Sequence, residues 1–167
     1  MKSFFKYIFF VVTLFFTVDA TFAAKTVSYL HRPLAAEGCE VTYSVSVQDS
    51  VYYIVVSVSS DRLFFLENPT MKIRTFKNEV ITLKGTVVGN LSKSSGVMIG
   101  NVFVPSDEVT CTAQFVTTPE QFEMLKYGVA KIRISMTPMN HEREFKSDVI
   151  GKKLYQFFLN EKANEEF

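Results

Sequence analysis

Alternating apolar and polar residues run through most of the chain from Lys25 to Met136, and this period of two constrains the fold most. The clearest stretch is 39–47 (CEVTYSVSV), where odd-numbered residues are apolar and even-numbered residues are polar. Successive side chains of a β-strand point to opposite faces, so this stretch predicts a strand with one buried face. The chain is therefore expected to be mainly β, with Cys39 on an inward face.

Short polar turns divide the alternating region into pairs of strands. After a turn at 48–50, the inward positions of 52–58 predict that this segment pairs with 39–47 in a hairpin. A second hairpin is predicted for 71–75 and 81–87, around another short polar turn. Because tight turns join neighbouring strands, the sheet is expected to be antiparallel.

The following stretch is expected to be a loop and then two strands. Residues 89–96 (GNLSKSSG) are polar with glycine at both ends, which is typical of a loop. Residues 97–104 (VMIGNVFV) and 109–116 (VTCTAQFV) each predict a strand, and the polar segment 105–108 separates them. Cys111 falls on the inward face of the second strand.

A short helix is predicted directly after these strands. Thr118 and Gln121 occupy the first and last positions of a capping box, and Pro119 suits the first helical position. Gly128 stands where a residue with left-handed backbone conformation often ends a helix. The alternation then returns in 130–136, which predicts one more strand with an exposed face.

A second helix is predicted near the C-terminus, after a polar loop at 137–144. It is expected to begin at Ser147 and to end in a frayed, acidic segment at 160–167. Its apolar stripe consists of Ile150, Leu154, Phe157 and Phe158. We expect this stripe to pack on the sheet, with docking of a partner as the alternative. The predicted fold is α+β: an antiparallel β sheet or sandwich of about eight strands, one short helix and a C-terminal amphipathic helix.

The N-terminal residues have the pattern of an export signal. Two lysines precede an apolar segment at 7–18, and small residues at 21–23 resemble a cleavage site, with cleavage after Ala20 as the alternative. The apolar segment is shorter than the roughly 20 residues that a membrane-spanning helix needs. We therefore expect 1–23 to be a signal peptide and 24–167 to be a single exported β-rich domain without a transmembrane span.

The charges of the exported part are balanced. The chain has 18 basic and 17 acidic residues, and the leader carries two lysines and one aspartate, which leaves 16 of each sign. Proteins that depend on phosphate contacts usually have a basic excess, so nucleic acid is not an expected partner. Lys72, Arg74 and Lys84 share the outward face of the second predicted hairpin, as candidate contacts for an anion or as solvated residues that protect an edge.

Cys39 and Cys111 are the only two cysteines of the chain. Both fall on inward faces of predicted strands, and an exported protein meets oxidising conditions that permit disulfides. The sequence leaves two alternatives open, a buried disulfide between the two strands or two separate buried thiols.

Few residues suit catalysis or metal binding. His31 and His141 are the only histidines and are expected at solvated loops or strand ends. His141 and Glu142 begin the helical zinc-protease motif, but Phe145 stands where its second histidine belongs. A G-x-S-x-G nucleophile motif is absent from the sequence. We therefore expect no metal site and no cofactor, and an enzyme is the less favoured interpretation.

Three segments resemble a known group of proteins. Residues 118–134 (TPEQFEMLKYGVAKIRI) and 144–158 (EFKSDVIGKKLYQFF) resemble the closing half of small exported proteins of unknown function from gut-dwelling Gram-negative bacteria. Residues 71–85 (MKIRTFKNEVITLKG) are similar to the central hairpin of the same proteins. The resemblance implies a periplasmic or secreted location and assigns no functional residue.

These observations favour a non-enzymatic exported domain that acts in the periplasm or outside the cell. Its expected partner is another protein or a component of the cell envelope. A carrier of a small apolar ligand is the first alternative, because the inward aromatic residues and methionines suit such a ligand as well as they suit a packed core. An enzyme that hydrolyses an envelope polymer is the second.

Overall fold

The computed structural model describes residues 25–31, 39–60, 64–65, 68–137 and 140–165. The predicted signal peptide therefore lies outside the described residues. The strands are β1 (Thr26–His31), β2 (Cys39–Gln48), β3 (Val51–Ser60), β4 (Phe64–Phe65), β5 (Thr70–Thr75), β6 (Val80–Ile99), β7 (Val102–Thr117), β8 (Val129–Ile134), β9 (Met136–Thr137) and β10 (His141–Glu144). The helices are α2 (Pro119–Leu125) and α3 (Gly151–Glu165).

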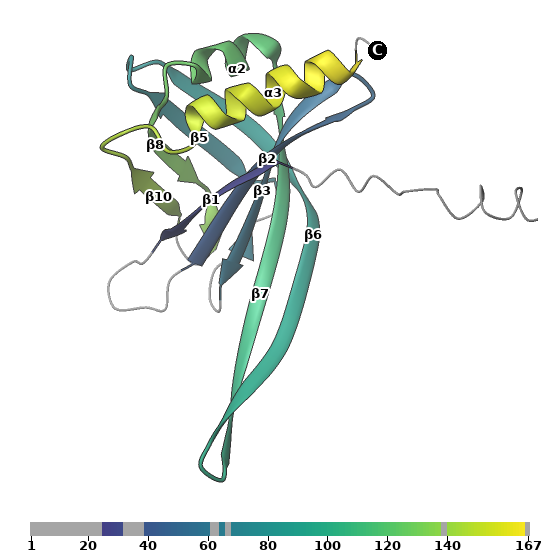
Figure 1. The fold of residues 1–167 in the computed structure, drawn as a ribbon, viewed down its shortest axis with the longest axis vertical. Coiled ribbons are helices and arrows are strands. Elements are labelled where there is room, and N and C mark those ends of the chain that lie inside the picture. The colour runs from purple at the N-terminus through teal and green to yellow at the C-terminus, as the bar shows by residue number, and fades with distance from the viewer. Residues whose placement is uncertain (1–24, 32–38, 61–63, 66–67, 138–139, 166–167) are drawn as a thin grey trace, which may run out of the picture.

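Eight of these strands form one curled antiparallel sheet in the order β1-β2-β3-β7-β6-β5-β8-β10, and β4 pairs with β9. The two helices lie together across one end of the sheet (Figure 1). The sheet curls so far that its edge strands meet: the Tyr29 hydroxyl of β1 lies 2.8 Å from His141 Nε2 of β10. The prediction of a mainly antiparallel β fold with a short helix and a C-terminal helix is confirmed at this level.

The first predicted hairpin is confirmed as β2 and β3. Its turn consists of Asp49 and Ser50, whose φ angles are +51° and +60°. Two consecutive left-handed residues match the twist of antiparallel strands, which makes this turn type common in hairpins. Val45 pairs with Ile54 beyond the turn, and both side chains are buried on the inward face.

The second predicted hairpin is confirmed as β5 and the beginning of β6, but β6 is far longer than predicted. It pairs with β5 as far as Lys84 and with β7 from Gly85 onward, so the strand turns a corner at this point. A Cβ atom on Gly85 would lie 2.6 Å from the Phe115 ring. Glycine therefore permits the close approach of β6 to β7 at the corner.

Beyond the corner, β6 and β7 form a long hairpin that projects from the rest of the molecule (Figure 1). We call residues 89–112 the arm; its base at 109–112 still pairs with β3, and the part beyond Val109 projects freely. The predicted loop at 89–96 is wrong, because these residues pair with β7, and 97–104 is not one strand but contains the turn at Gly100 and Asn101. Residues 105–108 continue β7. Backbone pairing needs no apolar pattern, which is why the polar arm sequence resembles a loop.

The predicted helix cap is confirmed at α2. The Thr118 hydroxyl accepts a hydrogen bond from the Gln121 backbone at 3.3 Å, and the Gln121 side chain accepts one from the Thr118 backbone at 2.9 Å. Gly128 follows the helix with φ at +78°, and its N–H donates to the Leu125 carbonyl at 2.9 Å. Both helix signals in the sequence therefore act as expected.

The C-terminal helix begins at Gly151 rather than at Ser147. One Asp148 carboxylate oxygen accepts from the backbone N–H groups of Gly151, at 2.8 Å, and Val129, at 2.9 Å. Asp148 thereby satisfies a free donor at the start of α3 and ties the helix to β8. The predicted frayed segment at 160–167 is wrong for residues 160–165, which continue α3. Glu165 accepts a 2.5 Å hydrogen bond from the Tyr52 hydroxyl.

The core lies between the inward face of the sheet and the two helices. The apolar stripe of α3 packs inward as predicted: Ile150, Leu154 and Phe158 are each at most 2% exposed. The Phe158 ring stacks on Phe122 of α2 with a centroid distance of 4.6 Å. The sheet contributes the β-branched and aromatic residues that alternation places on its inward face, so the core joins both layers.

The segment between β8 and α3 is more ordered than the predicted loop. Residues 141–144 form the edge strand β10, in which His141 pairs with Ile134. His141 is only 2% exposed, which contradicts the expectation of a solvated histidine. The Tyr29 ring stacks on it, and the Tyr29 hydroxyl also lies 2.9 Å from the Tyr43 hydroxyl. A short polar chain thus joins the two edges of the curled sheet.

Candidate binding surface

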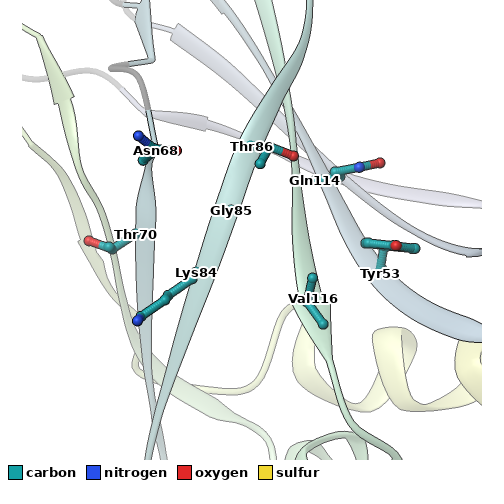
Figure 2. A pocket seen from close by; sticks show the side chains of 8 residues that line it. All are labelled: Tyr53, Asn68, Thr70, Lys84, Gly85, Thr86, Gln114 and Val116. Carbon is teal, nitrogen blue, oxygen red and sulfur yellow. The ribbon is translucent and has the colours of Figure 1, made fainter.

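A hollow of about 660 Å³ lies on the outer face of the sheet, which is the face turned away from the helices. It surrounds the corner in β6, and residues of β3, β5, β6 and β7 contribute to it (Figure 2). Its lining consists of Tyr53, Asn68, Thr70, Lys84, Gly85, Thr86, Gln114 and Val116. Four stretches of chain that are distant in sequence therefore meet in one concave surface.

The pairing of Gly85 with Phe115 decides which side chains face the hollow. Both residues point inward, and Phe115 is fully buried. Since neighbours along a strand face opposite sides, Lys84 and Thr86 must point outward on β6. Residues 114 and 116 point outward on β7 for the same reason. The corner therefore places polar outward residues of two strands around one glycine.

The polar groups that line the hollow are hydrogen-bond donors and acceptors and include no carboxylate. Lys84 supplies an ammonium group, two residues supply hydroxyls, and two supply carboxamides. The half-buried Tyr53 adds an aromatic ring with a hydroxyl, and Val116 adds an apolar contact. None of these lining residues is a carboxylate, a thiol or an imidazole. The hollow thus offers hydrogen bonds, one positive charge and one ring face.

The three predicted anion contacts are exposed on the same outer face, on the neighbouring strands β5 and β6. Only Lys84 lines the hollow. Arg74 forms an ion pair with Glu144 at 3.7 Å, which offsets its charge. Lys72 pairs across the strands with Thr82 and Arg133, outside the hollow.

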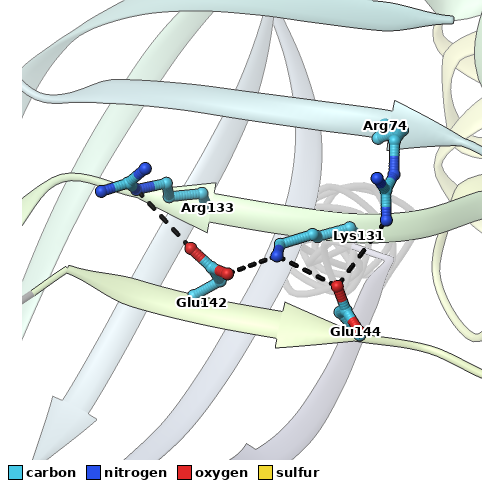
Figure 3. A network of polar contacts seen from close by, with 5 residues as sticks. All are labelled: Arg74, Lys131, Arg133, Glu142 and Glu144. Carbon is cyan, nitrogen blue, oxygen red and sulfur yellow. Dashed lines mark ion pairs between the residues drawn. The ribbon is translucent and has the colours of Figure 1, made fainter. Parts of the chain in front are cut away.

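Arg74 belongs to an ion-pair network across β5, β8 and β10 (Figure 3). Lys131 lies between the two acidic residues of β10, bound to Glu142 and, at 3.0 Å, to Glu144. Arg133 lies 3.7 Å from Glu142. The hydrogen bond from Lys131 lowers the pKa of the Glu142 carboxyl, and the same bond raises the pKa of Lys131. The network connects the edge strand β10 to β8 and β5. Because its groups are solvent-accessible, it contributes little to the free energy of unfolding.

Cys111 carries a free thiol that is buried on the inward face of β7. Cys39 begins β2, and its side chain lies outside the described part of the structure. Strand β3 separates β2 from β7, so the two backbones are about 9–10 Å apart. A disulfide requires Cα atoms within roughly 4.4 to 6.8 Å. This arrangement fits the alternative of separate thiols and not the disulfide.

Within the described ranges, no three side chains of the His, Cys, Asp or Glu type gather as potential metal ligands. Among the same residues, neither helix is long and apolar enough to cross a bilayer. Aromatic residues of the sheet pack on the helices, as the edge contacts of the Tyr52 ring with Phe122 and Phe158 show.

Sequence reasoning identified only Lys84 among the residues of the hollow. The alternation predicts that Tyr53 and Gln114 face outward on their strands. It does not predict that they lie near Lys84, because β3, β5 and β7 come together only in the folded sheet. Asn68, just before β5, has a left-handed backbone, with φ at +54°. No family model, curated protein or solved structure matches the chain, so the geometry of this surface is the basis for a functional proposal.

Proposed function

We propose that the protein is an exported, non-enzymatic binding domain whose outer hollow recognises a polar, negatively charged component of the cell envelope, such as an acidic sugar. The observation that carries the proposal is that Lys84, Tyr53 and Gln114, from three different strands, line one hollow on the outer face (Figure 2). Ligand sites commonly combine a concave shape with a few convergent polar groups.

Each lining group has a role that its chemistry favours. The Lys84 ammonium pairs with the acid group of the ligand, in a charge-assisted hydrogen bond. The ring of Tyr53 packs on the apolar face of a sugar ring, while its hydroxyl remains available as a donor or acceptor. Thr70, Thr86 and Gln114 supply partners for sugar hydroxyls. The site is open to solvent, so we expect modest affinity.

The cellular setting of the proposal rests on the sequence. The leader-like residues 1–23 and the resemblance of 118–134 and 144–158 to exported bacterial proteins both favour the envelope. The alternatives have less support. An apolar carrier would use inward residues that here pack on one another, and a hydrolase would need carboxylates that the hollow lacks.

Calorimetric titration with two sugars of equal length tests the proposal. Trigalacturonic acid carries one carboxylate per residue, and maltotriose is neutral. We expect the acidic sugar to bind the wild-type protein and Lys84→Met to weaken that binding about ten-fold, because one charge-assisted hydrogen bond is lost. Methionine keeps much of the apolar length of the lysine side chain, so the substitution removes mainly the charge.

Lys153→Met is the matched control, because Lys153 is an exposed lysine on α3, outside the hollow. It should bind the acidic sugar as the wild type does. Tyr53→Leu should weaken binding of the acidic sugar, and the variant should still prefer the acidic sugar to the neutral one. Equal binding of both sugars, or unchanged binding by the Lys84 variant, would refute recognition of an acidic ligand at this hollow.

A further inference from the structure

The turn of the arm is flanked by four exposed apolar side chains. Met98, Ile99, Val102 and Phe103 are 61%, 66%, 64% and 59% exposed. Soluble proteins commonly expose single apolar residues, but contiguous apolar groups on a projecting element mark a contact site. We call these four residues the arm tip.

The arm tip is apolar on both faces of the hairpin. Met98 pairs with Phe103, and Ile99 pairs with Val102. Paired residues share a face and consecutive pairs alternate, so the two pairs point in opposite directions. A groove on a protein surface would cover one face and leave the other in water. A fluid apolar phase would cover both.

Charge and backbone features of the tip agree with a fluid partner. Residues 96–105 (GVMIGNVFVP) contain no charged side chain. Pro105, which pairs with Gly96, has no backbone N–H, so it opposes the addition of another strand to β7. Strand addition by a second chain is therefore a poorer fit than contact through side chains.

We propose that the arm tip inserts into the interfacial region of a lipid bilayer. The two tip pairs extend about 7 Å along the arm, which matches the roughly 5–10 Å to which interfacial apolar groups are buried. The Asn101 amide at the turn limits the depth, since it keeps contact with water and head groups. From Ser92, the partner of Val109, to Ile99 the arm extends about 24 Å beyond its last contact with β3, so the tip contacts the bilayer while the body remains outside.

This inference does not depend on the proposed function. The tip lies about 45 Å along β6 from Gly85, at the corner that the hollow surrounds, so substitutions at one place leave the other intact. A protein that does not bind the acidic sugar could still insert its arm tip into a membrane. A protein that does not insert could still bind the sugar, so the two tests are independent.

A tryptophan reporter tests the insertion directly, because the chain contains no tryptophan. Phe103→Trp places the reporter at the tip, and Leu91→Trp places a matched reporter on the arm at a site that is 73% exposed. With phosphatidylcholine vesicles, the emission of Phe103→Trp should shift to shorter wavelength. Brominated acyl chains should quench it several-fold more than they quench Leu91→Trp. The leader is identical in both variants, and it cannot create this difference between them.

Serine substitutions on each face of the arm tip distinguish insertion into a bilayer from binding in a groove of another protein. The pairs Met98→Ser with Phe103→Ser and Ile99→Ser with Val102→Ser should each reduce the lipid-dependent protection of the tip from acrylamide about ten-fold. For this measurement Phe103→Trp reports on the pair Ile99 and Val102, Val102→Trp reports on the pair Met98 and Phe103, and Leu91→Ser is the control with no effect. Circular dichroism confirms that each variant is folded. Equal quenching of both reporters, or an effect of only one pair, would overturn the proposal.

Discussion

The body of the sheet and the arm share the strands β6 and β7, yet they differ in what covers the side chains. Ala113 and Phe115 of β7 are fully buried in the body, whereas Val102 and Phe103 of the same strand are more than half exposed on the arm. Both regions contain apolar residues in a paired strand. Strand formation and burial therefore have separate causes: pairing depends on the adjacent strand, and burial depends on a second layer.

The arm begins where its neighbours end. Pairing of β6 with β5 stops at Lys84, and pairing of β7 with β3 stops at Val109. Beyond these points the two strands pair only with each other in the described ladders. A two-stranded ribbon without a covering layer has low intrinsic stability in water, so the arm should open locally at a lower free energy than the body.

The largest expected contrast comes from the same substitution in the two regions. Phe158→Ala removes a buried ring that stacks on Phe122 and should lower the free energy of unfolding by about 3–5 kcal/mol. Phe103→Ala should change it by less than about 0.5 kcal/mol, because the ring is exposed. Urea unfolding followed by circular dichroism measures both values. Comparable losses would mean that the arm folds as part of the core.

Two glycines of β6 sharpen the comparison with a smaller effect. Gly85→Ala should destabilise the protein by about 1–3 kcal/mol, because the new Cβ would lie 2.6 Å from the Phe115 ring and 2.9 Å from the Gln114 carbonyl. Gly89→Ala meets nothing within 4 Å and should leave stability unchanged or raise it by up to about 1 kcal/mol. Thermal unfolding midpoints report the difference. A stable Gly85 variant would show that the corner does not need the close approach.

The smallest effect concerns the ion pairs that hold β10 to the body. The pKa of Glu142 lies below its ordinary value of 4.5, mainly through the hydrogen bond from Lys131. A lowered folded-state pKa stabilises the protein above pH 4.5, and this contribution is lost as the pH falls through the folded-state pKa. Glu142→Gln should therefore lose less stability than the wild type between pH 6 and pH 3.

Denaturant midpoints measured across this pH range test the prediction for Glu142. Glu161→Gln, on α3 outside the network, is the control and should follow the wild-type profile. A wild-type profile for Glu142→Gln would mean that the network contributes nothing at all, which is the lower limit for exposed ion pairs.

Local signals in the sequence predicted much of the body. The hairpin turn at Asp49 and Ser50, the capping box at Thr118 and the glycine at 128 all involve residues within a few positions of one another. The arm was missed because its polar segment 89–96 lacks alternation and resembles a loop. Residues 105–108, which pair with the second half of that segment, have no period of two either.

The candidate binding surface was predictable only in part. Exposure of Lys72, Arg74 and Lys84 followed from their alternation with buried residues, and the structure confirms that all three are exposed. The ion pair between Arg74 and Glu144 did not follow, because Glu144 lies in a segment that was predicted to be a loop. The burial of His141 was missed for the same reason.

The sequence by itself determined the elements whose causes are local: alternating strands, tight turns, a capped helix and the apolar stripe of α3. Only the tertiary structure decided where β6 turns its corner, which outward residues surround Gly85, and that the arm tip remains uncovered. The physical reason is that side-chain direction follows from neighbouring residues along the chain, whereas a concave surface or an uncovered apolar pair depends on which distant segments pack nearby.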